Sequence, residues 1–135
     1  VGQGSYWLNL EERSLQGSTQ SGIDLGSHTY ITLSGSVAVT LNGIPVTSGN
    51  DYSINVHAYP NENYSGNQLD NAKVDPTGTW TMLVEASSPA QTYYFEVSVY
   101  DYAAENLVRK GTGVSRQGST SPITGINLGT LAFNN

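Results

Sequence analysis

The residue types in this chain that could do chemistry are aromatic rings and uncharged polar side chains rather than acids, bases or nucleophiles. The sequence has nine Tyr and two Trp but two His and no Cys. No Gly-x-Ser-x-Gly segment marks an activated serine. The neighbours Glu11 and Glu12 would point to opposite faces of an extended chain, so they could not act as a facing acid and base. We therefore predict a protein that binds a ligand and catalyses no reaction.

Exposed Tyr and Trp rings can stack on the C–H faces of sugars, while Asn, Gln and Asp bond to the hydroxyl groups. In one such cluster, Tyr59 and Tyr64 lie near the amides of Asn63 and Gln68. In a second cluster, Asp101 lies between Tyr100 and Tyr102. Further outward rings are expected on the strands. The candidate ligand-binding residues are Trp7, Tyr59, Asn63, Tyr64, Gln68, Trp80, Tyr94, Tyr100, Asp101 and Tyr102.

Each candidate ring has a structural alternative. Trp80 is in phase with Met82 and Val84, which favours a place in the core. Trp7 is expected to face outward if residues 4–8 (GSYWL) match residues 78–82 (GTWTM), unless a loop or a neighbouring repeat covers it. The surface tyrosines could instead pack across strands on a polar face.

The sequence predicts no cofactor and neither nucleic acid nor membrane as a partner. The net charge is −6 and the five basic residues are scattered, so there is no basic patch for phosphates. Calcium remains an alternative ligand, since oxygens of Asp70, Asn71 and Asp75 could coordinate a hard cation. Their spacing is not that of an EF-hand loop.

Period-two alternation predicts the strands that must position these residues. The clearest run covers residues 30–41 and ends at Asn42-Gly43, a dipeptide typical of a type I′ hairpin turn. Pro45 has no N–H, so the returning strand should lie at a sheet edge. Three further alternating runs cover residues 52–59, 80–84 and 93–100.

The run 52–59 places His57 and Tyr59 on its outward face, and we expect His57 to be a surface residue. The polar stretch 60–78 has no period and is predicted to be the longest loop. Short strands separated by Gly, Pro, Asn and Ser turns predict an all-β fold. The expected architecture is an antiparallel two-sheet β-sandwich, Ig-like or jelly-roll-like.

The length of 135 residues predicts one domain spanning residues 1–135. The chain also contains an internal sequence repeat: residues 16–19 (QGST) and 22–26 (GIDLG) recur as residues 117–120 (QGST) and 125–129 (GINLG). Residues 1–29 are therefore interpreted as the tail of a preceding related unit or as an extra strand pair.

The turn chemistry of four segments resembles the carboxypeptidase-regulatory-like and transthyretin-like sandwich repeats. These segments are residues 35–39 (GSVAV), 42–46 (NGIPV), 56–59 (VHAY) and 75–82 (DPTGTWTM). The resemblance implies a seven-stranded sandwich that serves as a spacer, a binding module or an adhesin unit. The abundance of Tyr, Asn, Gln and Gly also resembles the noncatalytic carbohydrate-binding modules of secreted bacterial polysaccharide hydrolases.

We therefore expect a module that binds plant cell-wall β-glucans, such as cellulose, xyloglucan or mixed-linkage glucan, and so holds an attached enzyme at the polysaccharide. Its expected setting is extracellular, within a larger multidomain secreted protein. The alternative is a structural repeat or spacer domain of a bacterial surface adhesin, for which the internal sequence repeat is the main support.

Overall fold

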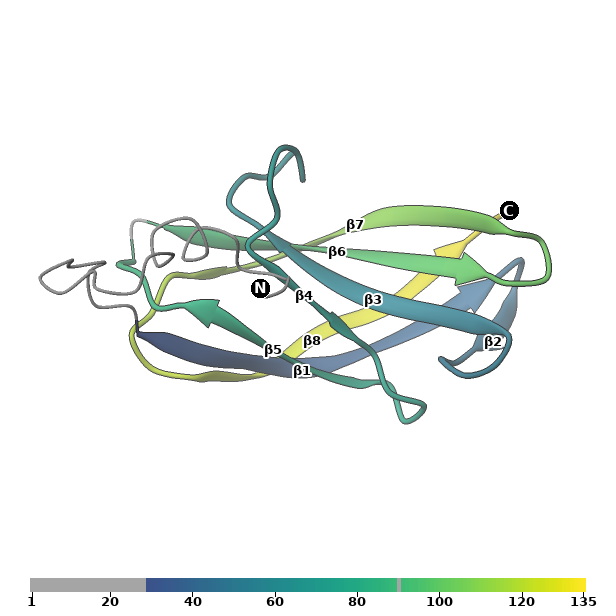
Figure 1. Cartoon of the computed structure of the whole chain (residues 1–135), viewed down its shortest axis with the longest axis horizontal. Coiled ribbons are helices and arrows are strands. Elements are labelled where there is room, and N and C mark those ends of the chain that lie inside the picture. Colours follow the sequence, from purple (N-terminus) through teal and green to yellow (C-terminus); the bar gives the residue numbers. More distant parts are fainter. Residues whose placement is uncertain (1–28, 90) are drawn as a thin grey trace, which may run out of the picture.

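The computed structural model describes residues 29–89 and 91–135, and these form two four-stranded sheets packed as a β-sandwich (Figure 1). The predicted all-β fold is confirmed. Within the described residues there is no helix, and hence none that could span a membrane. The strands are β1 (Tyr30–Leu41), β2 (Ile44–Val46), β3 (Tyr52–Tyr59), β4 (Asp70–Lys73), β5 (Thr79–Glu85), β6 (Thr92–Asp101), β7 (Asn106–Gln117) and β8 (Ile123–Phe133).

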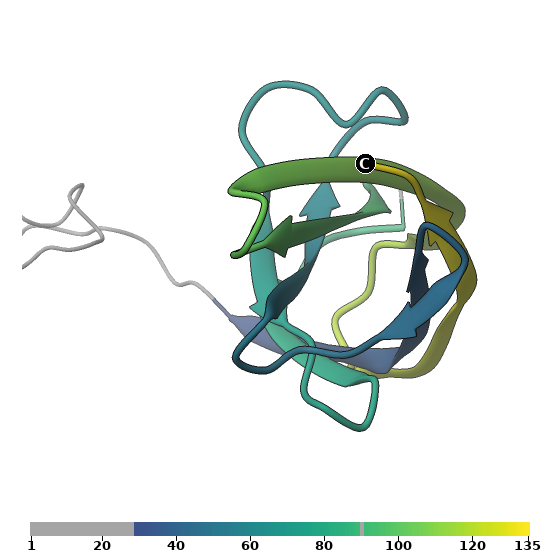
Figure 2. The ribbon, with the colours of Figure 1, turned by 90° about the vertical axis from the view of Figure 1, so that its right-hand side faces the viewer.

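The two sheets differ in their pairing. Sheet B has the order β4-β3-β6-β7, with every neighbour antiparallel. In sheet A, β1 pairs antiparallel with β5 along its first part and with the short β2 at its end, as the Pro45 argument predicted. Strand β8 lies parallel to β1 and adds one parallel ladder to an otherwise antiparallel sandwich. The view along the long axis shows the sheets curving around the interior, with β7 and β8 adjacent at one side (Figure 2).

Alternation decides which side chains fill the space between the sheets. The odd-numbered apolar residues of β1 and β6 and the even-numbered ones of β5 are all buried. Burying each such side chain contributes about 1.5–3 kcal/mol. Trp80 is 2% exposed and packs against Phe95, with 5.7 Å between the ring centroids. The core alternative for Trp80 is therefore confirmed, and its place among the ligand-binding candidates was wrong.

Three strands were not predicted as such. The expected loop 60–78 contains β4, whose four residues include one buried apolar side chain, Ala72, and so show no readable period. Strand β7 is mostly polar and half-exposed. In β8 the alternation is interrupted by shifts in register against β1, where Gly125 and Gly129 adopt positive φ.

A tight turn between β4 and β5 is built around Asp75. Its carboxylate accepts bonds from the backbone and hydroxyl of Thr77, at 2.9 and 2.5 Å, and from those of Thr79, at 3.1 and 2.7 Å. The Thr77 hydroxyl and then the Thr79 hydroxyl contribute most to lowering the pKa of Asp75 to about 2. Gly78 ends the turn at a φ of +88°, and its carbonyl accepts the N–H of Val37 at 2.9 Å.

Replacing Thr77→Val removes the shortest of these bonds and should raise the pKa of Asp75. Because the folded pKa lies below the unfolded value of 3.8, the carboxylate stabilises the fold above about pH 4, and this contribution is lost as the pH falls through about 2. An NMR pH titration of the Asp75 carboxyl checks the prediction. An unchanged midpoint in Thr77→Val would contradict it.

Gly35→Ala should destabilise the fold by about 3 kcal/mol or more, because the added methyl would lie 1.9 Å from the carbonyl oxygen of Ile126 in the paired strand β8. Urea denaturation measures the change. Gly49→Ala is the matched control, since nothing lies within 4 Å of its added Cβ. Equal midpoints for the two variants would show that the β1–β8 ladder is not this tightly packed.

Candidate ligand-binding face

The outward face of sheet B, together with the 60–69 loop over it and the β6–β7 turn beside it, gathers most of the predicted binding residues that the structure describes. The cross-strand register sets its rows: Asn55 lies opposite Ser98, which lies opposite Arg109. We use the name sheet-B face for the residues of β3, β6 and β7 that face outward, together with Tyr102, whose ring contacts that of Tyr100. They are Ser53, Asn55, His57, Tyr59, Tyr94, Glu96, Ser98, Tyr100, Tyr102, Leu107, Arg109 and Gly111.

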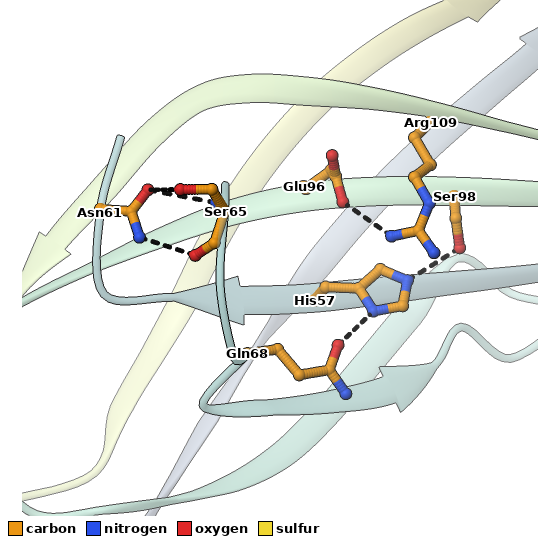
Figure 3. A network of polar contacts seen from close by, with 7 residues as sticks. All are labelled: His57, Asn61, Ser65, Gln68, Glu96, Ser98 and Arg109. Carbon is orange, nitrogen blue, oxygen red and sulfur yellow. Dashed lines mark hydrogen bonds and ion pairs between the residues drawn. The ribbon is translucent and has the colours of Figure 1, made fainter. Parts of the chain in front are cut away.

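The loop of residues 60–69 covers one half of the sheet-B face. Its Tyr64 reaches β7, where the phenol oxygen accepts the N–H of Gly113 at 3.3 Å. The ring lies against Gly111, where any Cβ would come within 2.3 Å of it. Tyr64 also meets the ring of Tyr59 edge to face, at 6.1 Å between centroids. Asn61 shapes the loop by bonding to Ser65 through its side-chain oxygen and nitrogen (Figure 3).

His57 fastens the loop to the sheet. Its Nδ1 lies 2.8 Å from Oε1 of Gln68, and its Nε2 lies 2.8 Å from Oγ of Ser98 (Figure 3). Gln68 Oε1 can only accept, so Nδ1 carries the proton and Ser98 donates to Nε2 in the neutral ring. His57 is buried, which corrects the expectation of a surface residue. The His57 side chain points away from the core as predicted, but the 60–69 loop covers it.

A Ser–His hydrogen bond is also the contact that activates a serine nucleophile. Here the third partner is the neutral amide of Gln68, which cannot stabilise an imidazolium as a carboxylate does. Ser98 is almost fully buried. We interpret the trio as an anchor for the loop. Beside it, Arg109 and Glu96 form an ion pair at 3.3 Å, with the arginine side chain about half exposed.

The other half of the sheet-B face is open and carries aromatic rings. Tyr100 and Tyr102 lie edge to face with 5.1 Å between ring centroids, and Tyr102 is 49% exposed. Leu107, directly opposite Tyr100, is exposed as well. The amide of Asn55 and the hydroxyl of Ser53 are half-buried beside these rings. This open half combines flat apolar surface with uncharged hydrogen-bonding groups.

Several predicted residues have structural roles instead. Asp101 accepts the N–H groups of Ala103 and Ala104 and so builds the β6–β7 turn. Gln68 binds His57, and Tyr59 is buried beneath the loop. Asn63 is exposed on the loop, whereas Tyr64 and Tyr94 are half-buried. Trp7 lies outside the described residues.

The open half also includes residues that the sequence argument passed over: Ser53, Asn55, Leu107 and Arg109. The alternation of β3 indicates that Ser53 and Asn55 face outward. Nothing in the sequence places Leu107 and Arg109 beside them, because that depends on the β6–β7 register.

The alternative calcium ligands do not converge on one loop. Asp70 and Asn71 belong to β4, where Asp70 Oδ2 accepts the N–H of Leu83 at 3.2 Å. Asp75 lies beyond the other end of β4 and is bonded to Thr77 and Thr79. Within residues 29–89 and 91–135, no group of three or more His, Asp or Glu side chains could hold a metal ion.

Gly111→Ala should displace the Tyr64 ring from β7 while leaving the fold intact, because the clash involves the end of a side chain and not backbone. Proton NMR should show the Tyr64 ring signals moving toward solvent-exposed values. Gly43→Ala, with nothing within 4 Å of its added Cβ but a φ of +84°, is a control for strain without a clash. Unchanged Tyr64 signals in Gly111→Ala would contradict the packing described here.

Comparison with known proteins does not assign this face a role. No protein family matches the chain, and no curated protein shows significant sequence similarity to it. The case for a function therefore depends on the geometry and chemistry of the face itself.

Proposed function

We propose that the protein is a noncatalytic module that binds neutral polysaccharide on the open half of the sheet-B face. The observation that carries the proposal is the Tyr100–Tyr102 ring pair, partly open to solvent, beside uncharged polar side chains. Sugar rings have apolar faces and hydroxyl edges, so a site for them needs both kinds of surface. The substrate class is a β-glucan of the plant cell wall, bound outside the cell.

The open half suits a polymer by where it ends rather than by its length. The whole face is about 20 Å long between Tyr94 and Tyr100, at a rise of about 3.4 Å per residue, and the open half is about half of that. The 60–69 loop closes the Tyr94 end, whereas the Tyr100 end continues to the β6–β7 turn at the end of the molecule (Figure 1). An extended glycan could therefore leave the face at the Tyr102 end. Shallow contact of this kind gives micromolar to millimolar affinity, roughly −4 to −8 kcal/mol.

A second candidate function, a structural repeat of a surface adhesin, is favoured by two observations. Strand β1 begins at one end of the long axis and β8 ends at the other, as units in an end-to-end array require (Figure 1). The repeated segments 117–120 and 125–129 also have specific structural roles. Gly118 leaves no room for a Cβ beside the carbonyl of Ser88, and Ile126 and Leu128 are buried in the core. Their recurrence at residues 16–26 supports a repeated unit.

Tyr102→Ala should weaken retention by soluble β-glucans in affinity gels, and by insoluble cellulose in pulldowns, about tenfold or more, since truncating a stacking ring removes upward of ~1.4 kcal/mol. Tyr30→Ala, which removes an exposed ring from sheet A, is the matched control and should bind as the unaltered protein does.

The outcomes separate the two functions. If Tyr102→Ala is retained as well as the unaltered protein, the open half of the sheet-B face is not the site. If the unaltered protein is retained by none of cellulose, xyloglucan and mixed-linkage glucan, glucan binding is excluded and the structural repeat becomes the better explanation.

A further inference from the structure

The large exposed apolar side chains of the sandwich gather toward the two ends of its long axis. Strand β1 begins at one end, and β8 finishes at the other (Figure 1). Between the ends, the outward side chains of β1 from Thr32 to Thr40 are Thr, Ser and Ala. The described residues expose six large apolar side chains: Tyr30, Leu69 and Leu83, which we name the entry end, and Ile44, Tyr102 and Leu107, which we name the exit end.

The entry end lies where β1 begins and β5 finishes. Tyr30 is 54% exposed and Leu83 is 53% exposed. The register pairs Leu83 with Thr32, so Leu83 lies diagonally across the β1–β5 ladder from Tyr30 on the same outward face. Leu69 lines the same cavity as these two residues. Three of the six exposed side chains therefore lie together at the start of the sandwich.

At the exit end, Asn135 joins the two connections that carry the other three side chains. Its backbone N–H donates to Oδ1 of Asn42 in the β1–β2 hairpin, at 3.1 Å. Its side-chain amide donates to Oδ2 of Asp101, beside the β6–β7 turn, at 3.3 Å. The exposed side chains next to these connections are Ile44, Tyr102 and Leu107.

The internal sequence repeat fixes the spacing between units. With residues 22–26 matched to residues 125–129, Tyr30 and Phe133 each stand four residues after the matched segment. Phe133 ends β8 and is 3% exposed, whereas Tyr30 begins β1 and is open to solvent. In an array with this spacing, the position that ends one unit is also the position that begins the next. No linker separates the two units.

We propose that the entry end docks on the exit end of a preceding unit of the same fold in the same polypeptide, with β8 of one unit running directly into β1 of the next. Without a linker the two ends must meet, and the apolar side chains of each are covered by the other. Head-to-tail contacts of this kind build an open array rather than a closed dimer. The proposal rests on the structural-repeat function and does not require glucan binding.

Two chains that each contain two units test the proposal. In the joined chain, residues 1–133 are followed directly by residues 31–135, so that Phe133 ends one unit and begins the next. In the linked chain, residues 1–135 are connected to residues 30–135 through about ten Gly and Ser residues, which form a flexible spacer. The full single chain, residues 1–135, is the reference.

Urea unfolding measures whether neighbouring units stabilise each other. We expect the midpoint of the joined chain to lie about 0.5 M or more above that of the single chain, because contact between units adds to the stability of each. The linked chain should unfold as the single chain does. Amide NMR relaxation should show the two units of the joined chain tumbling together. Equal midpoints for the joined and linked chains, or independent tumbling in the joined chain, would overturn the proposal.

One substitution placed in either unit of the joined chain provides a matched control. Ile44→Ala in the first unit truncates a side chain at the joint and should lower the urea midpoint toward that of the linked chain. Ile44→Ala in the second unit lies at an exit end that no unit follows. It should have no more effect than in the single chain, where Ile44 is 65% exposed. Leu83→Ala in the second unit tests the other side of the joint and should also lower the midpoint. Equal effects of Ile44→Ala in the two units would contradict docking.

Glucan affinity gels separate this proposal from the binding function. The joint covers Tyr102 of the first unit, so the joined chain should be retained no better than the single chain. The linked chain leaves both faces open and should be retained more strongly through avidity. Equal retention of the joined and linked chains on a glucan that retains the single chain would contradict a covered Tyr102. If no chain is retained, glucan binding fails, whereas the unfolding and relaxation results still decide the joint.

Discussion

The register between β3, β6 and β7 is the constraint on which the candidate binding face depends. Side chains alternate between the two faces of a strand, so a slip of one residue would turn Asn55 and Tyr100 into the core and Val56 and Val99 out of it. Such a slip is opposed by the burial of the apolar set, which includes the fully buried Val56 and Phe95. The same hydrophobic packing that holds the sandwich together therefore fixes the rows of polar and aromatic residues on its outer surface.

The loop 60–69 divides that surface into two halves with different chemistry. Beneath the loop, His57 and Ser98 are buried and hydrogen-bonded, and Tyr64 closes over Gly111. His57 and Ser98 are hydrogen-bonded within the protein, as most buried polar groups are. The rings at the β6–β7 turn remain partly open to solvent. Covering one half of a sheet leaves the other as a platform that ends at the tip of the molecule.

The open half of the sheet-B face suits a neutral, hydroxyl-rich polymer because its flat rings lie beside uncharged polar side chains. Tyr100 and Tyr102 supply the rings, and Ser53 and Asn55 supply the polar groups. Arg109 also belongs to this half, and its charge is paired with that of Glu96.

Local alternation and turn chemistry were enough to predict the sandwich, the hairpin at Asn42-Gly43 and the core positions of β1, β5 and β6. It also placed Trp80 in phase with the core. Tertiary structure alone decided that His57 is buried, that Tyr64 lies on Gly111 and that β8 joins β1 in parallel. These features join residues far apart in the chain, such as His57 with Ser98 and Tyr64 with Gly113. The period-two alternation of side chains along one strand does not indicate which other strand or loop covers its face.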